Sequence, residues 1–214
     1  MVRLTKSPLP PDITISSEQD YRKGEVIDTL IKDCHGKCYL CEEKPTTINV
    51  EHITPHRNDS NLKYDWNNLF IACGHCNNIK HVKYDEIINP VKRDPEEHIA
   101  LSAVITEELM DHVQIETLTS DEITINTAKL LNLIYNGEST SIKRHECANL
   151  RNEHLMPILR RFYQYICGYR NEPDLGFADL IKKEIDRSSA FAAFKRKIIR
   201  DDPELSRIFS ASLE

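Results

Sequence analysis

The sequence predicts an α+β fold that is mainly helical, with a small metal-stapled core near its N-terminal end. Two Cys-x-x-Cys pairs, Cys38/Cys41 and Cys73/Cys76, are the first observation. Four thiolates in two close pairs suit a tetrahedral structural Zn²⁺, because each pair spans one edge of the tetrahedron. The second observation is a short β-branched run between the pairs, and the third is helical spacing of apolar residues after residue 121. A redox dithiol is the alternative for the cysteines, but neither pair lies in a thioredoxin-like context.

The N-terminal segment contains three prolines in residues 1–15 and is expected to run extended against the rest of the chain. Ser17 is the expected N-cap of a first helix, since it precedes two acidic residues and an apolar pattern of helical period. That pattern continues to Cys34, and Gly36 is expected to end the helix.

Between and after the cysteine pairs, the pattern predicts strands and one helix. Residues 48–53 are the expected first strand, and 56–65 a polar loop. Trp66–Ala72 leads into the second pair, and a helix is expected from Cys76 to about Tyr84. We draw a boundary near Pro90–Pro95.

The remainder is expected to begin with two short strands and to be helical after them. The expected elements are strands Ile99–Thr106 and His112–Thr117, joined around Glu108-Leu109, and a helix Asp121–Tyr135 stopped by Asn136-Gly137. A long helix is expected over Ser141–Tyr169, kinked or divided at Pro157. Three further helices are expected to start at Pro173-Asp174, at Ser188 or Ser189, and at Pro203.

The formal net charge of −6 argues against a general nucleic-acid binder, but the charge is unevenly distributed. Residues 91–141 carry 3 Lys/Arg against 10 Asp/Glu, and residues 142–200 carry 13 against 7. The basic segment suits contact with a phosphate backbone, and it equally suits an ordinary solvated helix face. The candidate phosphate contacts in it are Arg160, Arg161, Lys195, Arg196 and Lys197.

The sequence has no apolar run near 18 residues and no signal-peptide pattern at its start, so no membrane partner is expected. Seven cysteines in 214 residues, four of them paired as metal ligands, indicate a reducing compartment. A cytoplasmic location is therefore expected.

Residues 38–81 resemble the HNH endonucleases. These are ββα-metal nucleases, and in many members a zinc ion holds the active site together. The resemblance rests on Glu51-His52-Ile53-Thr54-Pro55, on Asn68-Leu69 before the second cysteine pair, and on Cys76-Asn77-Asn78-Ile79-Lys80. It implies a zinc-stapled ββα-metal HNH core followed by a helical C-terminal region.

The resemblance also implies roles for individual residues. His52 is the expected general base, and Asn68 is expected to position its loop, with Asn67 as the fallback if the register is off by one. Glu51, where the family more often has Asp, is expected to bind a catalytic divalent ion, Mg²⁺ or Mn²⁺, with Asn77 and His81. Asn77 and His81 are four apart on the expected helix and would share a face; the alternative is that Asn77 caps the helix and His81 is solvated. Lys80 is expected to contact phosphate or to be exposed.

More weakly, the whole chain resembles PtuB, the HNH subunit of Septu and retron-linked anti-phage defence systems. Segments similar to Ile88-Asn89-Pro90, Asp94-Pro95 and residues 125–133 carry this likeness. It implies a PtuA-like ATPase as partner and, in a retron setting, a reverse transcriptase with its msDNA.

We therefore expect an N-terminal arm and helix over 1–37, the HNH core with its zinc over 38–90, and a partner-binding region over 91–214. The expected function is endonucleolytic cleavage of DNA, with RNA such as tRNA left open as a second substrate. The alternative function is a catalytically idle zinc module that scaffolds a complex or binds nucleic acid.

Overall fold

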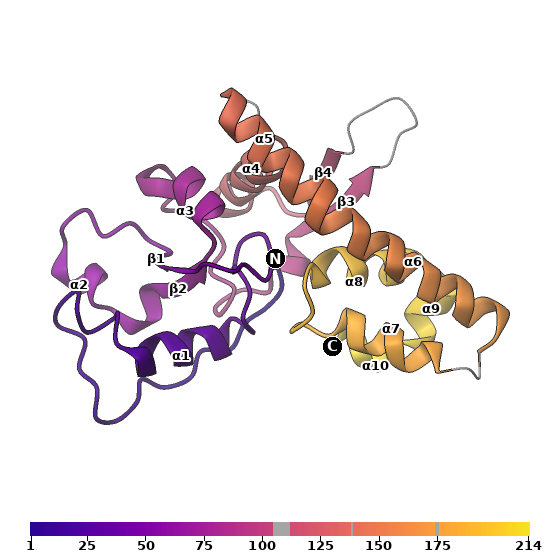
Figure 1. Cartoon of the computed structure of the whole chain (residues 1–214), viewed down its shortest axis with the longest axis horizontal. Helices are drawn as coiled ribbons and strands as arrows, with labels where there is room; N and C mark the ends of the chain where they lie inside the picture. Colours follow the sequence, from indigo (N-terminus) through magenta and orange to yellow (C-terminus); the bar gives the residue numbers. More distant parts are fainter. Residues whose placement is uncertain (105–111, 138, 174–175) are drawn as a thin grey trace.

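The computed structural model describes residues 1–104, 112–137, 139–173 and 176–214. Helices dominate it, and two small antiparallel sheets lie among them, which confirms the predicted mainly helical α+β class (Figure 1). The strands are β1 (Asn49–His52), β2 (Leu69–Ala72), β3 (Ile99–Val104) and β4 (His112–Thr117). The helices are α1 (Gly24–Asp33), α2 (Ser60–Lys63), α3 (Gly74–Lys80), α4 (Glu122–Asn136), α5 (Ser141–Asn149), α6 (Met156–Asn171), α7 (Phe177–Ile185), α8 (Ala192–Asp201), α9 (Pro203–Ile208) and α10 (Ser210–Leu213).

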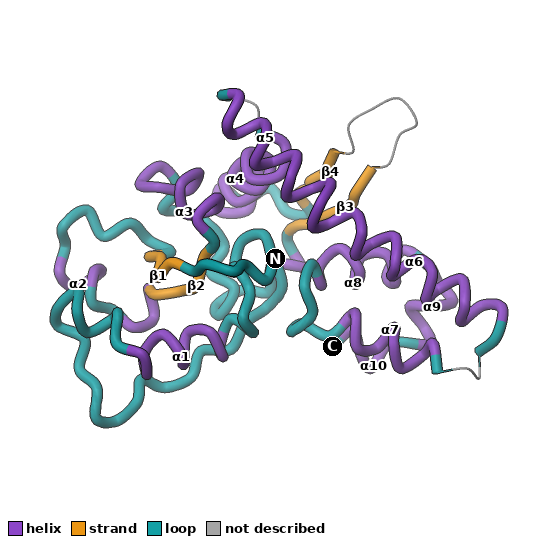
Figure 2. Tube along the Cα trace, in the orientation of Figure 1, coloured by secondary structure: helices purple, strands orange, loops and turns teal. Residues whose placement is uncertain are grey.

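The N-terminal segment before α1 is loop and turn throughout (Figure 2). Its apolar side chains are buried against the core, as expected for residues 1–15. Ser17, however, does not cap the first helix. The Asp20 carboxylate accepts the backbone N–H groups of Ser16 and Ser17 at 3.0 and 2.9 Å, which folds this stretch into a turn, and α1 begins only at Gly24. At the other end Gly36, at φ +67°, ends the helix as predicted, with its N–H donated to the Ile31 carbonyl.

The two strands β1 and β2 lie between the cysteine pairs, and helix α3 begins within the second pair. β1 pairs antiparallel with β2, so that Glu51 lies opposite Phe70 and His52 opposite Leu69. The prediction for α3 was wrong at both ends. The helix starts at Gly74, because the Cys73 side chain caps its N-terminus. It ends at Lys80 rather than near Tyr84. The polar loop 56–65 also contains the short helix α2, capped by Asp59.

The second sheet matches the prediction where it is described. β4 has the predicted bounds, and β3 begins at Ile99 as predicted and is described as far as Val104. Residues 105–106 and the connection around Glu108-Leu109 lie outside the described residues. Helix α4 follows. Asp121 is its N-cap, so the helix starts one residue later than predicted, at Glu122, and it ends at Asn136 with Gly137 as its C-cap.

The long helix predicted over 141–169 is a continuous helical run with a defect ahead of its proline. α5 passes into a π-helical turn over Leu150–Leu155, and α6 then starts with Pro157 in its first turn. Proline has no N–H for the preceding turn, and a wider turn accommodates that loss. Two later predictions placed helix starts too early: α7 begins at Phe177 and α8 at Ala192, each after a residue with positive φ. α9 begins at Pro203 as predicted.

One main hydrophobic core joins segments from both sides of the boundary drawn near Pro90–Pro95. It contains buried residues from Met1 to Phe194, and the Tyr135 hydroxyl of α4 donates to the Cys41 carbonyl at 2.8 Å. A second, smaller cluster fills the space among α6, α7, α8 and α9. Among the described helices, none has both the length and the apolar character needed to cross a bilayer.

Candidate active site and zinc centre

The four paired cysteines converge on one buried point. Their Sγ atoms all lie within 4.8 Å of one another, and those of Cys41 and Cys73 are 3.9 Å apart. A tetrahedron with Zn–S bonds of about 2.3 Å has edges of about 3.8 Å, so the cluster fits a zinc ion closely. Cys38 and Cys41 follow α1, whereas Cys73 and Cys76 frame the start of α3. A metal held here would therefore fasten the two ends of the β1–β2 segment together.

His52, at the end of β1, has a defined tautomer. Its Nε2 lies 2.9 Å from the Lys63 carbonyl oxygen, which can only accept a hydrogen bond. Nε2 therefore carries the proton, and in the neutral ring Nδ1 carries the lone pair. Partial burial lowers the pKa of His52 below its ordinary value, with the Lys63 hydrogen bond acting in the opposite direction. The ring is consequently neutral at pH 7 and can take a proton at Nδ1.

Asn68 holds the turn that follows His52. Its side-chain amide donates to the carbonyls of Thr54 and Leu62 at 2.8 and 2.9 Å, and its oxygen accepts the Thr54 N–H at 2.8 Å. The side chain is buried, and these three bonds tie Thr54, two residues after His52, to Leu62. Asn67 is exposed and makes no such bond, which favours Asn68 over Asn67 for the positioning role.

Glu51 is buried and both of its carboxylate oxygens have protein partners. Oε1 accepts from the Lys80 ammonium at 2.8 Å, and Oε2 accepts from the Tyr39 hydroxyl at 2.8 Å. Burial raises the pKa of Glu51, and the Lys80 charge and the two hydrogen bonds oppose that rise. Lys80 is itself fully buried and also donates to the His52 carbonyl at 2.8 Å. The prediction that Lys80 contacts phosphate or is exposed was therefore wrong, because its ammonium is buried and bound to Glu51 and to the His52 carbonyl.

The three expected ligands of the divalent ion, Glu51, Asn77 and His81, line one pocket. A pocket of about 410 Å³ is lined by Glu51, His52, Asn77 and His81 among others. His81 is the exposed C-cap residue of α3, at φ 40°, and its backbone N–H donates to the Asn77 carbonyl. Within the described part of the chain, the four cysteines are the one group of three or more His, Cys, Asp or Glu side chains close enough to hold an ion. Both carboxylate oxygens of Glu51 already have protein partners, so this carboxylate would have to leave Lys80 or Tyr39 in order to bind an ion.

Two residues near His52 carried no signal in the sequence. The His56 ring lies 4.8 Å from the His52 ring, and the Tyr21 ring lies 5.8 Å from it on another side, both nearly edge to face. His56 follows the Glu-His-Ile-x-Pro motif directly, but no motif includes it. Tyr21 comes from the N-terminal arm, 31 positions before His52, so only the folded chain brings it there.

The candidate phosphate contacts of the basic segment divide into two groups. Arg160 and Arg161 are exposed on α6. Lys195 and Arg196 are buried and pair with Glu184 and Glu96, so the prediction that they contact nucleic acid was wrong.

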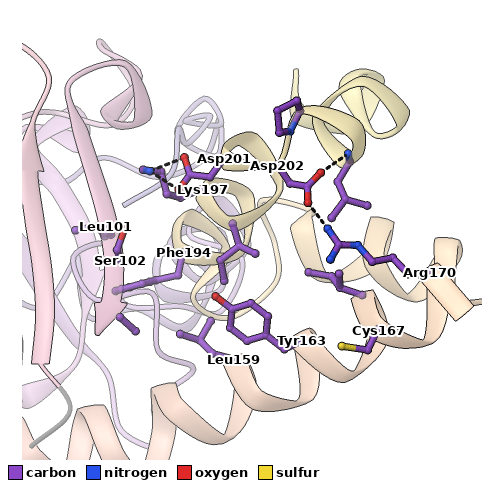
Figure 3. Close-up of a pocket in the computed structure, with 15 residues that line it drawn as sticks. Leu101, Ser102, Leu159, Tyr163, Cys167, Arg170, Phe194, Lys197, Asp201 and Asp202 are labelled. Atoms are coloured by element: carbon purple, nitrogen blue, oxygen red, sulfur yellow. Dashed lines mark hydrogen bonds and ion pairs between the residues drawn. The ribbon is translucent and has the colours of Figure 1, made fainter. Parts of the chain in front are cut away.

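Lys197 lines a separate, mostly apolar cavity of about 530 Å³ between β3, α6, α8 and α9 (Figure 3). Its ammonium binds the Asp201 carboxylate at 2.5 and 2.6 Å, and at the same rim Arg170 pairs with Asp202. Figure 3 also places Tyr163 and the exposed Cys167 of α6 beside these charges. The charges of this rim are mutually paired, Lys197 with Asp201 and Arg170 with Asp202.

One family model matches the part of the chain that contains the cysteine cluster and His52. Residues 32–83 match the family model described as HNH endonuclease. The matched segment contains all four cysteines, Glu51, His52, Asn68, Asn77 and His81. No curated protein and no solved structure matches the chain. The match suggests nuclease activity for the matched segment, and the helices after residue 83 lie outside it.

Proposed function

We propose that the chain is a metal-dependent endonuclease that hydrolyses phosphodiester bonds of nucleic acid, DNA first and RNA such as tRNA second. The observation that carries the proposal is the His52 imidazole, neutral and oriented by the Lys63 carbonyl at 2.9 Å within a segment that matches the HNH family. Zinc on Cys38, Cys41, Cys73 and Cys76 would supply folding free energy, on the order of 10 kcal/mol for structural sites.

In the proposed reaction, His52 Nδ1 takes a proton from a water molecule whose oxygen attacks the phosphorus atom. The bond between phosphorus and the 3′ oxygen breaks, and the leaving oxygen takes a proton from solvent. The products have 5′-phosphate and 3′-hydroxyl ends. Mg²⁺ or Mn²⁺ is the ion to be expected from the family. The Glu51 carboxylate accepts hydrogen bonds from Lys80 and Tyr39, so the proposed reaction contains no step on that ion.

The test is incubation of the purified full chain with plasmid, single-stranded DNA and tRNA, with and without Mg²⁺ or Mn²⁺. His52→Ala is the matched control. Cleavage by the parent that His52→Ala abolishes supports the proposal. Equal cleavage by both proteins would assign the activity to a contaminant or to another residue.

The alternative is an idle zinc module that scaffolds a complex or binds nucleic acid. The buried Lys80–Glu51 pair favours it, since an active site that needs Glu51 for an ion would have to break this pair first. Absence of cleavage under every ion, both alone and with the partner below, would support this alternative.

The proposal includes a defence setting in the reducing cytoplasm and an ATPase partner of the PtuA type that gates the nuclease. In a retron the reverse transcriptase and its msDNA would join the complex. The helices after residue 91 would carry the docking surface, and Ile142 on α5, at 71 % exposure, is the apolar position chosen to test it. The full chain should co-purify with the neighbouring ATPase, Ile142→Lys should weaken the association, and Ile142→Leu should preserve it. An ATPase that fails to co-purify with the parent would remove the partner from the proposal.

A further inference from the structure

His52 lies between two hollows of similar size. One is the pocket lined by Glu51, Asn77 and His81, called here the loop-side pocket. The other, called the arm-side pocket, also measures about 410 Å³. Both pockets are lined by His52 together with Val50, His56 and Asn77. The arm-side pocket adds Tyr21, Arg22 and Ile27, which precede the HNH-matched segment, and Ile48 and Asn49 from within it. A strand of nucleic acid with its scissile phosphate at His52 has a nucleotide on each side, so it needs both hollows.

The arm-side pocket has the chemistry that a nucleotide requires. Tyr21, Ile27 and Ile48 give it an apolar wall, and Asn49 and Asn77 add amide groups. Its volume lies within the range of about 300–1,000 Å³ that small-ligand pockets usually have. Apolar and aromatic walls suit a base or sugar, whereas a cation at the rim suits the phosphate.

Arg22 supplies that cation, and its charge is weakly compensated. Its guanidinium lies 3.8 Å from Glu18, with both side chains more than half exposed, so the attraction is small. Glu18 also has a closer partner, the Lys63 ammonium at 2.6 Å. The three groups together carry a net positive charge.

The same contacts fix the arm against the site. Lys63 pairs with Glu18 of the arm through its side chain and accepts from His52 through its backbone carbonyl. The Tyr21 ring stands perpendicular to the His52 ring, and Asp20 orders the turn just before it by binding the N–H groups of Ser16 and Ser17. Arg22 is thus displayed from an ordered turn beside the expected base.

We propose that the arm-side pocket is the subsite for the nucleotide adjacent to the scissile phosphate, with Arg22 binding the next phosphate along the strand. The proposal rests on the function proposed above and adds residues that precede its family match. Arg22 binds substrate and does not take part in proton transfer. Loss of Arg22 should therefore weaken binding, raise KM and leave the pH dependence of cleavage unchanged.

The experiment measures binding separately from cleavage. The full chain carrying His52→Ala and its zinc is titrated against a fluorescein-labelled 12-nucleotide single-stranded DNA, and against RNA of the same sequence, at several salt concentrations. Adding Arg22→Ala should weaken binding about threefold to tenfold and reduce the slope of log K against log salt by about 0.7, the value for one phosphate contact on a single strand. Arg22→Lys should retain most of the affinity.

Arg207→Ala is the matched control, an exposed arginine on α9 whose removal should change neither quantity. If Arg22→Ala and Arg207→Ala give the same affinity and slope as the His52→Ala parent, the subsite is wrong. If the His52→Ala parent binds neither oligonucleotide, it is wrong as well. Cleavage by the chain with His52 intact tests the nuclease function separately, so the two proposals fail in different ways.

Discussion

Lys80 and Glu51 form an ion pair of 2.8 Å that is almost wholly removed from solvent, and Lys80 also binds the His52 carbonyl. Removing one partner leaves a buried charge without compensation, which typically costs about 3–5 kcal/mol. Lys80→Met is therefore expected to lower the free energy of unfolding by about that amount in urea titrations. The double variant Lys80→Met/Glu51→Gln should recover most of the loss. A Lys80→Met protein as stable as the parent would show that Glu51 is not buried as a charge.

The stability of Lys80→Met should also depend on pH in a defined direction. Burial already raises the pKa of Glu51, and removal of the Lys80 charge, which opposes this rise, should raise it further. A carboxyl with a raised folded-state pKa stabilises the fold fully below its unfolded pKa and loses that contribution as pH rises through the folded pKa. Compared with the parent, Lys80→Met should be least destabilised below about pH 4.5, and unfolding measured from pH 4 to 8 tests this. A destabilisation that stays constant across this range would contradict the assignment to Glu51.

Zinc should be part of the fold. Freshly purified protein should contain one zinc per chain, and Cys73→Ser should lose it together with cooperative unfolding, because an incomplete ligand set forfeits the metal's contribution to folding. Metal analysis and thermal unfolding measure both effects. Cys167→Ser, at an exposed cysteine, is the control and should retain zinc and stability. Stoichiometric zinc in Cys73→Ser would rule out the four-cysteine site.

His52 should determine the pH dependence of cleavage. A general base works in its neutral form, and the pKa of His52 is lowered from 6.5 by burial. Activity should rise with pH through a value below 6.5 and be level above it, provided that chemistry limits the rate. His52→Ala should abolish cleavage while leaving zinc content and the unfolding midpoint close to the parent's. His112→Ala, at an exposed histidine on β4, should preserve the profile.

The basic residues of the C-terminal helices should separate into two classes. Arg196 binds Glu96 at 2.9 Å and the Ile185 and Ser212 carbonyls at 3.0 Å, so Arg196→Ala should cost about 3–5 kcal/mol of stability. The double variant Arg160→Ala/Arg161→Ala should change stability by less than about 1 kcal/mol. If these two arginines contact duplex DNA, the double variant should reduce the slope of log K against log salt by about 1.8. An unchanged slope would make this face of α6 an ordinary solvated surface.

The sequence was a good guide wherever the signal was local. The cysteine spacing predicted the metal cluster, the run at 48–53 predicted β1, and Pro157 marked the place where the long helical run changes its winding. Each of these depends on a few neighbouring residues. The Glu-His-Ile-x-Pro motif likewise led to His52, whose hydrogen bond to Lys63 then defined its tautomer.

The failures came from contacts that no local pattern records. Lys80 occupies a position that looks exposed, and only its pairing with Glu51, 29 residues earlier, shows that it is buried. Helix α3 ends before His81, which has a positive φ although it is not a glycine, so the sequence contained no signal for this end. Lys195 and Arg196 form part of a basic run, but the fold turns both inward to acids on other elements. Tyr21 reaches His52 only because the arm folds back across the site.

The first cysteine pair is held by the far end of the chain, and this has a consequence for dissecting the protein. The buried Lys37 ammonium donates to the Arg187 and Ser189 carbonyls, and the buried Glu42 carboxylate accepts the Ala193 N–H. A fragment ending at Pro90 would leave both charges without these partners, so the HNH-matched segment is not a removable module. Fragments 1–90 and 91–214, co-expressed as separate chains, should instead find each other and restore the zinc-bound fold as a complemented pair.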